Sequence, residues 1–217
     1  DRFLLQAEVY KERFMNLKIP EEKILVCGNI KADEAFNAVN RLPSNQDIKN
    51  FLKVPDVDGN GKKILTLASS HLSDEKLLLP VINQMNKYFY FIIVPRHMSR
   101  LQEIKKQLQS YRINFTFWSE IPGLSSSNSK ETFNQDKTLI FDSMGYLLSI
   151  LKISDIVFMG GTLERHIGGH NLYEPAVLGK FIVGGPFYNN FPDIGSELAN
   201  QGSYKVVRNS EELLGLL

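Results

Sequence analysis

The sequence predicts an α/β fold, a doubly wound, Rossmann-like parallel sheet with helices on both faces. The first observation is a set of six short segments that are apolar along nearly their whole length, as a sheet buried on both faces requires: 64–68, 89–94, 113–117, 138–141, 156–159 and 181–183. The second is that segments of helical character separate most of these runs: 73–86, 99–110, 143–151 and 171–178. Such segments are long enough for the right-handed crossovers that join parallel strands.

Composition and length limit the classes of function. The chain has 217 residues, enough for one large domain or one domain plus part of another. It is 43% hydrophobic and 23% charged, and no run approaches the roughly 20 apolar residues of a membrane span. A net charge of +1 provides no general attraction for nucleic acid, so any phosphate must be bound at a local site. Cys27 is the single cysteine, which excludes an intrachain disulfide and fits a reducing cytoplasm.

The sequence divides into three regions, 1–42, 43–63 and 64–217. Leu4, Ala7, Phe14 and Leu17 recur at helical spacing, and a strand at 24–27 follows. We interpret residues 1–42 as the end of a preceding domain and a hinge.

Polar and turn-forming residues dominate the next region, 43–63, which predicts a linker. Residues 64–217 then form the predicted binding domain, and within it the Ser-rich segment 120–137 reads as a mobile surface loop. The chain starts at Asp1 without an initiator Met, and the capped helix that begins at Ser210 is short. We therefore expect a piece of a longer protein.

A glycine-rich segment follows the strand at 156–159. It runs Gly160-Gly-Thr-Leu-Glu-Arg-His-Ile-Gly-Gly-His-Asn171 and opens into a predicted helix. Glycines let backbone N–H groups approach an anion closely, and a helix N-terminus adds unpaired donors. The alternative is a pair of tight turns without a ligand. The combination favours a phosphate site, with candidate residues Gly161, Thr162, Gly168, Gly169, His170 and Asn171.

Glu174 follows this segment by one helical turn. Its spacing from Asn171 is that of an N-cap and its capping-box partner, which is one interpretation. In a phosphate-binding context, its carboxylate can instead accept hydrogen bonds from the two ribose hydroxyls of a nucleotide. Both interpretations stay open from the sequence.

Other polar residues follow neighbouring strands. Arg96 comes after the strand at 89–94, and its guanidinium can form two parallel hydrogen bonds to a phosphate or carboxylate. A surface Arg paired to an acid is the simpler explanation. Ser69 and Ser70 follow the strand at 64–68, where a turn and an N-cap explain them nearly as well. Ligands of such sheets bind at the carboxyl ends of the strands, so these side chains are candidates for the same crevice.

Met144 and Gly145 lie in the turn Asp142-Ser-Met-Gly145 after the strand at 138–141, where the backbone can meet a nucleobase. His170 and Glu174 are four residues apart but have no third ligand at workable spacing, so the sequence predicts no metal. A P-loop lysine motif and a serine triad are both absent, and no cofactor is predicted.

Taken in order, a series of motifs resembles the C-terminal half of bacterial 3-deoxy-D-manno-octulosonic acid (Kdo) transferases, which are GT-B glycosyltransferases. The motifs are Gly28-Asn-Ile-Lys31-Ala-Asp33, Pro95-Arg-His97, Asp142–Leu147, Gly160-Gly-Thr162, Ile167–Asn171, Glu174-Pro-Ala176 and Leu178-Gly-Lys180. The resemblance covers nearly the whole chain. Departures occur at Glu164–His166, Tyr173 and Tyr188–Phe191, around the expected site.

The resemblance implies an inverting enzyme of lipopolysaccharide synthesis that takes Kdo from CMP-Kdo. The acceptor would be a lipid A precursor at the cytoplasmic face of the bacterial inner membrane. Arg96 and the Gly168–Asn171 turn would hold the phosphate, Met144 and Gly145 the cytosine, and Glu174 the ribose. Secondary candidates are Lys31, Ser69, Ser70, Gly161 and Thr162.

The family's catalytic glutamate and its membrane-associating segment belong to an N-terminal domain. We therefore expect no catalytic residue in this chain and no transfer by the chain alone. Two alternatives stay open: a GT-B enzyme that uses a UDP-sugar, and a non-catalytic nucleotide-binding module. The sequence leaves open the number of Kdo units transferred, the preferred lipid and the oligomeric state.

Overall fold

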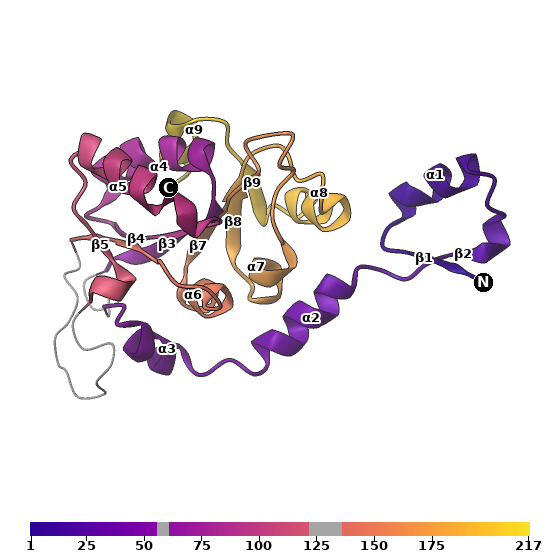
Figure 1. Cartoon of the computed structure of the whole chain (residues 1–217), viewed down its shortest axis with the longest axis horizontal. Helices are drawn as coiled ribbons and strands as arrows, with labels where there is room; N and C mark the ends of the chain where they lie inside the picture. The colour runs from indigo at the N-terminus through magenta and orange to yellow at the C-terminus, as the bar shows by residue number, and fades with distance from the viewer. Residues whose placement is uncertain (56–60, 122–135) are drawn as a thin grey trace. The chain divides into compact units, whose positions relative to one another are not determined.

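The computed structural model describes residues 1–55, 61–121 and 136–217 (Figure 1). Residues 56–60 of the predicted linker and most of the predicted surface loop at 120–137 lie outside these residues. The chain divides into two compact units, Asp1–Arg41 and Leu42–Leu217.

The second unit contains a seven-stranded sheet with all strands parallel, as the sequence predicts. Its order is β5-β6-β4-β3-β7-β8-β9. The strands are β3 (Lys63–Ser70), β4 (Phe89–Pro95), β5 (Phe115–Phe117), β6 (Thr138–Ile140), β7 (Ile156–Met159), β8 (Phe181–Gly184) and β9 (Tyr204–Val206). Residues of β4 are buried throughout, which explains why its apolar run has no alternation.

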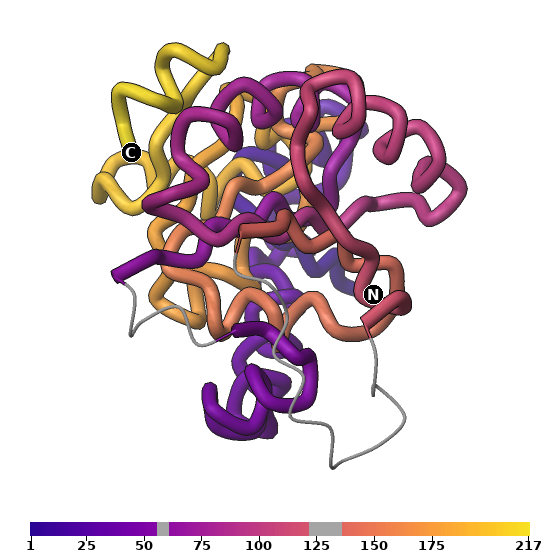
Figure 2. Tube along the Cα trace, turned by 90° about the vertical axis from the view of Figure 1, so that its left-hand side faces the viewer, coloured from indigo at the N-terminus to yellow at the C-terminus, as the bar shows by residue number. Residues whose placement is uncertain are grey.

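Helices cover both faces of this sheet (Figures 1 and 2). The helices are α3 (Asn45–Leu52), α4 (Leu72–Met85), α5 (Leu101–Ser110), α6 (Leu147–Ile153), α7 (Tyr173–Val177), α8 (Pro192–Asn200) and α9 (Ser210–Leu216). One buried cluster joins the sheet to α4, α5 and α9 through residues such as Leu78, Ile104 and Leu213. Another joins it to α3 and α6 through Leu52 and Ile150. The doubly wound architecture is confirmed.

Several elements differ from the sequence expectations. Within the segment expected as a linker, α3 forms and places Ile48 and Leu52 in the core. Helix α6 begins at Leu147 rather than near Ser143, because residues 142–146 form a turn that leads into it. Neither α8 nor β9 was expected; β9 pairs with β8 at the edge of the sheet, and α8 precedes it.

The first unit contains a parallel strand pair, β1 (Phe3–Leu5) and β2 (Ile24–Val26), with α1 (Lys11–Asn16) between them and α2 (Ile30–Val39) after them. The expected strand at 24–27 is present. The helix predicted from the spacing of Leu4, Ala7, Phe14 and Leu17 is confirmed only at Phe14, which lies in α1. Leu4 lies in β1, Ala7 is extended, and Leu17 follows the end of α1. None of the helices in the described part of the chain is both long and apolar enough to cross a bilayer.

Candidate functional site

A pocket of about 340 Å³ opens where β3, β4 and β7 end. Its lining residues come from the ends of these strands, from the segments that follow them, and from the segments after β6 and β8: Ser69, Arg96, Leu147, Met159, Gly169, His170, Asn171, Glu174, Asn190 and Phe191. This is the edge at which ligands bind in doubly wound sheets. The structure therefore brings Ser69, Arg96 and the 169–174 segment into one site, as the sequence led us to expect.

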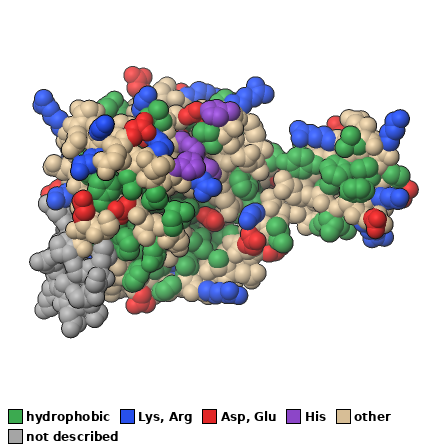
Figure 3. All heavy atoms as spheres, viewed as in Figure 1, with side chains coloured by type: hydrophobic (Ala, Val, Ile, Leu, Met, Phe, Trp, Pro, Cys, Tyr) green, Lys and Arg blue, Asp and Glu red, His purple; other side chains and the backbone are tan. Residues whose placement is uncertain are grey.

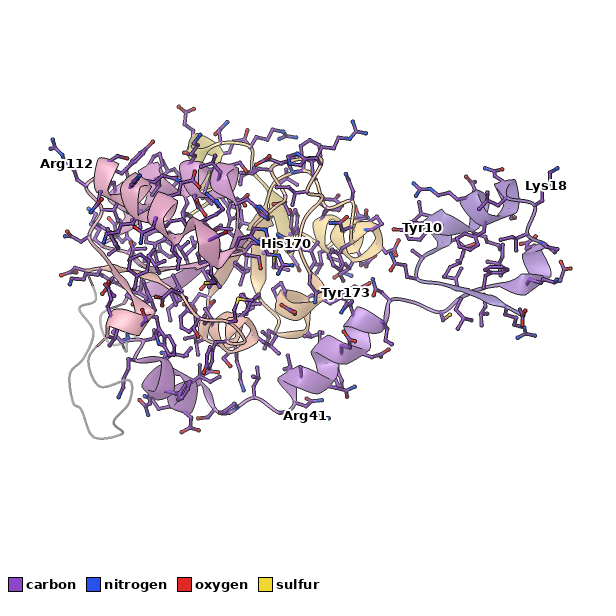
Figure 4. The ribbon with its side chains drawn as sticks, in the orientation of Figure 1. Tyr10, Lys18, Arg41, Arg112, His170 and Tyr173 are labelled. Carbon is purple, nitrogen blue, oxygen red and sulfur yellow. The ribbon has the colours of Figure 1, made fainter. Side chains whose placement is uncertain are left out.

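A second pocket, of about 460 Å³, is lined by residues that include Arg112, Asn114 and Lys137. Arg112 and Asn114 precede β5, and Lys137 precedes β6, so this pocket lies at the amino ends of the strands (Figure 4 labels Arg112). The smaller pocket has the position that the fold favours for a nucleotide.

The end of β3 is distorted at the pocket. Ser69 has a left-handed backbone (φ 53°), and the register with β4 shifts between Ala68 and Ser70. A positive φ at a non-glycine residue is uncommon, and such strain concentrates at functional sites. The shift turns Ser70 inward, where its hydroxyl donates a hydrogen bond to Glu75 (2.8 Å). Ser69 lines the pocket, whereas Ser70 is buried and bonds Glu75.

Arg96 stands at the pocket with an exposed side chain, and its backbone N–H donates to the carbonyl of Ser70 (3.1 Å). Within the described residues, its guanidinium has no ion-pair or hydrogen-bond partner. The nearby buried carboxylate of Glu75 is already bound by Arg100 through two hydrogen bonds, of 2.9 and 2.8 Å. Arg96 thus provides a positive charge that is available to an anionic ligand.

Gly161 and Thr162, which the sequence suggested as phosphate-binding candidates, lie outside the pocket lining. The Gly161 N–H donates to the Asp74 carboxylate (2.8 Å). The Thr162 hydroxyl donates to the carbonyl of Met159 and accepts from the Gly185 N–H, both at 2.7 Å. These groups are satisfied inside the protein, and neither residue lines the pocket. Gly161 and Thr162 hold the turn in shape beneath the site.

The second glycine pair forms the wall of the pocket. Gly168 and Gly169 have φ angles of 74° and 80°, which glycine adopts without strain. The Gly169 N–H donates to the carbonyl of Gly161 (2.9 Å). Gly169 is in the lining, and Gly168 lies directly beside it against Asn190.

Asn190 fixes this turn, and it was not among the residues predicted for the site. Its side-chain amide donates to the carbonyls of Ile167 (2.8 Å) and Gly169 (2.9 Å). Its backbone N–H donates to the carbonyl of Gly168 (3.0 Å). The only sequence signal was its place in the segment Tyr188–Phe191, noted as a departure from the resembled family. Its role depends on contacts across 21 to 23 residues, which spacing does not reveal.

We expect Asn190→Ala to lower the free energy of unfolding by about 1–2 kcal/mol, since the carbonyls of Ile167 and Gly169 both lose the side-chain amide that joins them. The variant should also weaken anion binding, because the glycine turn is less fixed. Urea denaturation measures the first effect. Asn189→Ala, at an exposed neighbour, is the control and should be near neutral. Equal stability of the two variants would contradict this role.

Glu174 and Asn171 contact each other at the pocket. The Asn171 amide donates to the Glu174 carboxylate (3.0 Å), and its oxygen accepts from the Tyr173 N–H (3.1 Å). This contact is not the predicted capping box, because the N-cap of α7 is Leu172 and no side chain caps the helix there. Both side chains line the pocket. The hydrogen bond from Asn171 therefore fixes the Glu174 carboxylate at the site.

The remaining candidates lie away from this lining. Met144 is 66% exposed, and Gly145 has a φ of 90° in the turn before α6. Neither lines the pocket, although Leu147 from the same segment does. Lys31 belongs to the first unit, where its ammonium pairs with Glu34 at 2.9 Å.

Two histidines meet at the edge of the site. The Nε2 atoms of His71 and His170 are 2.8 Å apart, and the rings are stacked at a 9° interplanar angle. Burial lowers the pKa of His170 to about 4, and the nearby His71, Arg96 and His97 act in the same direction. Burial also lowers the pKa of His71. Both rings are therefore neutral at pH 7. Figure 3 shows histidine side chains close to Lys and Arg side chains on this face.

Asp74 lies beneath the pocket with no exposed surface. One of its oxygens accepts the N–H groups of His71 (2.9 Å) and Gly161 (2.8 Å). The other oxygen is buried and has no hydrogen-bond partner in the described structure. Burial raises the pKa of this carboxyl to about 7 despite the two backbone donors.

The sequence is similar to curated Kdo transferases. It is 32% identical over 216 residues to 3-deoxy-D-manno-octulosonic acid transferase of Chlamydia muridarum, covering 99% of this chain and 46% of that protein. It is 31% identical to the enzyme of the same name from Chlamydophila psittaci, covering 94% of this chain and 43% of that protein. The chain thus spans less than half the length of these relatives. No protein-family model matches it.

Solved structures support the fold. The C-terminal CMP-Kdo binding domain of WaaA from Acinetobacter baumannii superposes with a TM-score of 0.62 at 24% identity, covering 84% of this chain and 86% of that domain. A glycosyltransferase from Rickettsia africae gives a TM-score of 0.59 at 17% identity, covering 52% of that chain. The predicted resemblance to Kdo transferases and to a C-terminal GT-B domain is therefore confirmed.

Proposed function

We propose that this chain is the donor-binding domain of an inverting glycosyltransferase that transfers Kdo from CMP-Kdo to a lipid A precursor. The observation that carries the proposal is the pocket at the carboxyl ends of the strands. There, a guanidinium that has no partner among the described residues lines the same pocket as a glycine turn and a carboxylate that Asn171 fixes. The similarity to Kdo transferases over nearly the whole chain supports Kdo as the sugar, and the fold shared with a CMP-Kdo binding domain supports CMP as the nucleotide.

Each group has a role in this proposal. Arg96 and the Gly168–Asn171 turn hold the phosphate, and Glu174 accepts the ribose hydroxyls. Within the turn, the N–H groups of Gly168 and Gly169 already bond carbonyls, so the backbone donors for the phosphate are those of His170 and Asn171, which have no partner in the described structure. Met144 and Gly145 contact the cytosine. As the bond between the sugar and the phosphate breaks, negative charge grows on CMP, and Arg96 stabilises that charge without reorganisation. The chain itself thus supplies binding and electrostatic stabilisation of the leaving group.

Activity on the lipid acceptor belongs to the same proposal. The acceptor would be a lipid A precursor at the cytoplasmic face of the bacterial inner membrane, as in the family that the sequence resembles. The test is to supply CMP-Kdo and the precursor to the full-length protein and to follow CMP release. Release that does not depend on the acceptor would contradict the assignment.

Titration calorimetry with CMP, UDP and NAD tests the donor nucleotide directly on this chain. We expect CMP to bind and the other two to bind at least tenfold more weakly. Affinity should be modest, since a domain that closes over the sugar contributes much of the binding energy in a two-domain enzyme. Binding of UDP or NAD without CMP at millimolar concentration would overturn the donor assignment.

Glu174→Gln separates the two interpretations of that residue. The amide retains the size and capping capacity of the side chain but weakens charge-assisted hydrogen bonds to ribose. We therefore expect CMP affinity to fall by about 1–3 kcal/mol with little change in melting temperature. Unchanged affinity with lowered stability would leave Glu174 as a capping residue only.

A further inference from the structure

The contact between His71 and His170 constrains which nitrogens carry protons. Their Nε2 atoms face each other at 2.8 Å, so one must donate and the other must accept. A neutral imidazole carries one proton, and the accepting ring must therefore carry its own on Nδ1. Two arrangements are possible, and they present opposite groups at the Nδ1 atom of His170.

His170 lines the pocket, whereas His71 does not. No other hydrogen bond to the His170 ring is present in the described part of the structure. Its Nε2 edge lies over Gly161, since a Cβ built there would be 3.0 Å from this nitrogen. With Nε2 committed to His71, Nδ1 is the nitrogen that remains for a ligand. It offers a donor if His71 donates in the pair, and a lone pair if His71 accepts.

We propose that His71 is a positioning residue: its Nε2–H donates to His170, which holds His170 in the Nδ1–H form and gives the pocket a neutral N–H donor for the phosphate. The inference rests on the proposed function for the identity of the ligand. A lone pair on Nδ1 would repel a phosphate oxygen, so an anion selects the arrangement in which His71 donates.

The charges around the pair explain why a neutral donor is needed. The groups that face the two rings are mostly basic: Arg96, His97 and Arg100, with Glu164 as the acid that opposes them at His71. Beneath them lies the buried Asp74, and Glu174 lines the same pocket. Burial and the neighbouring basic groups oppose a positive charge on His170, whose pKa is about 4. A fixed tautomer provides the hydrogen bond without that charge.

The first test measures CMP affinity by calorimetry for His71→Leu and His71→Gln at pH 7.5 and pH 5. Leucine removes the donor, so His170 is free to take the wrong tautomer, and we expect affinity to fall about 3- to 10-fold at pH 7.5. At pH 5 the loss relative to wild type should shrink, because binding can then protonate His170 and supply an N–H in either case. The ionisation of CMP itself affects both proteins equally, so it cancels from the ratio of the variant's affinity to that of wild type at each pH.

The glutamine variant provides the rescue. Its amide can donate to His170 from nearly the position of the imidazole Nε2, so affinity should stay within about twofold of wild type. A residue that only supports the fold would give equal losses at both pH values. His166→Gln, at an exposed histidine outside the pocket, is the matched control. Unchanged affinity of His71→Leu at pH 7.5, or a loss that is independent of pH, would overturn the inference.

Nitrogen-15 NMR of the imidazole rings in the wild-type chain gives a second readout that needs no variant to fold. We expect a proton on Nδ1 of His170 and on Nε2 of His71 at pH 7.5, both free and with CMP. Protonated Nε2 on His170 would overturn the inference while CMP binding, and with it the proposed function, stood. Absence of CMP binding by the wild-type chain would instead overturn the proposed function, and the tautomers would still be measured.

Discussion

The free energy of unfolding of Asp74→Asn, taken relative to that of wild type, is expected to rise by on the order of 3 kcal/mol between pH 5 and pH 8. The carboxyl is fully buried, and its pKa is about 7 in the folded state against an unperturbed value of 3.8. Its contribution to stability is complete below pH 3.8 and is lost as the pH rises through 7. Asparagine keeps the acceptor for the Gly161 and His71 N–H groups but does not titrate.

The measurement is urea denaturation of both proteins from pH 5 to pH 8, with the difference in unfolding free energy plotted against pH. A difference is needed because His170, whose pKa is lowered, has the opposite effect: its contribution is lost as the pH falls below about 6.5. Asp136→Asn, at an exposed acid, is the control. A flat difference curve for Asp74→Asn would show that this carboxyl is ionised in the folded state at pH 5.

The second large effect is expected for Arg100→Met, with a loss of about 3–5 kcal/mol in the free energy of unfolding at pH 7. The Glu75 side chain is 2% exposed and that of Arg100 is 18% exposed, and two hydrogen bonds join them. Removal of the guanidinium leaves a buried carboxylate with only the Ser70 hydroxyl as a side-chain partner in the described structure. Burial already raises the pKa of Glu75, so the loss of its partner raises it further.

A double variant checks the cause of this loss. Glu75→Gln combined with Arg100→Met removes both charges and should recover a large part of the lost stability. Glu103→Gln serves as the control, because Glu103 also bonds Arg100 but is half exposed. A loss below about 1 kcal/mol for Arg100→Met would place this pair among ordinary surface ion pairs.

The sheet and the place of the site could be predicted because both depend on local patterns. Strands buried on both faces require runs that are apolar throughout, and β3, β4 and β7 have them. The residues directly after these strands, such as Ser69 and Arg96, then meet at one edge of the sheet. The position of these residues directly after buried strands was sufficient to predict that they lie at that edge.

Other features depend on partners that are distant in the sequence. Helix α3 has a polar composition, and only its Ile48 and Leu52 reach the core, so the local pattern resembled a linker. Ser44 caps this helix by accepting from the Asp47 N–H, a signal that was present but weak. Similarly, Gly161 and Thr162 were predicted to face a phosphate, but their polar groups bind Asp74 and Gly185, respectively, at separations of 87 and 23 residues.

The pocket lined by Arg96 and the Gly168–Asn171 turn is the proposed binding site for the phosphate of CMP. A crystal structure of the chain grown or soaked with millimolar CMP tests this directly. We predict phosphate oxygens within hydrogen-bond distance of the Arg96 guanidinium and of N–H groups of the turn, with the ribose hydroxyls at Glu174. CMP bound instead at the pocket of Arg112 and Lys137, or bound with its phosphate away from Arg96, would contradict the assignment of this site.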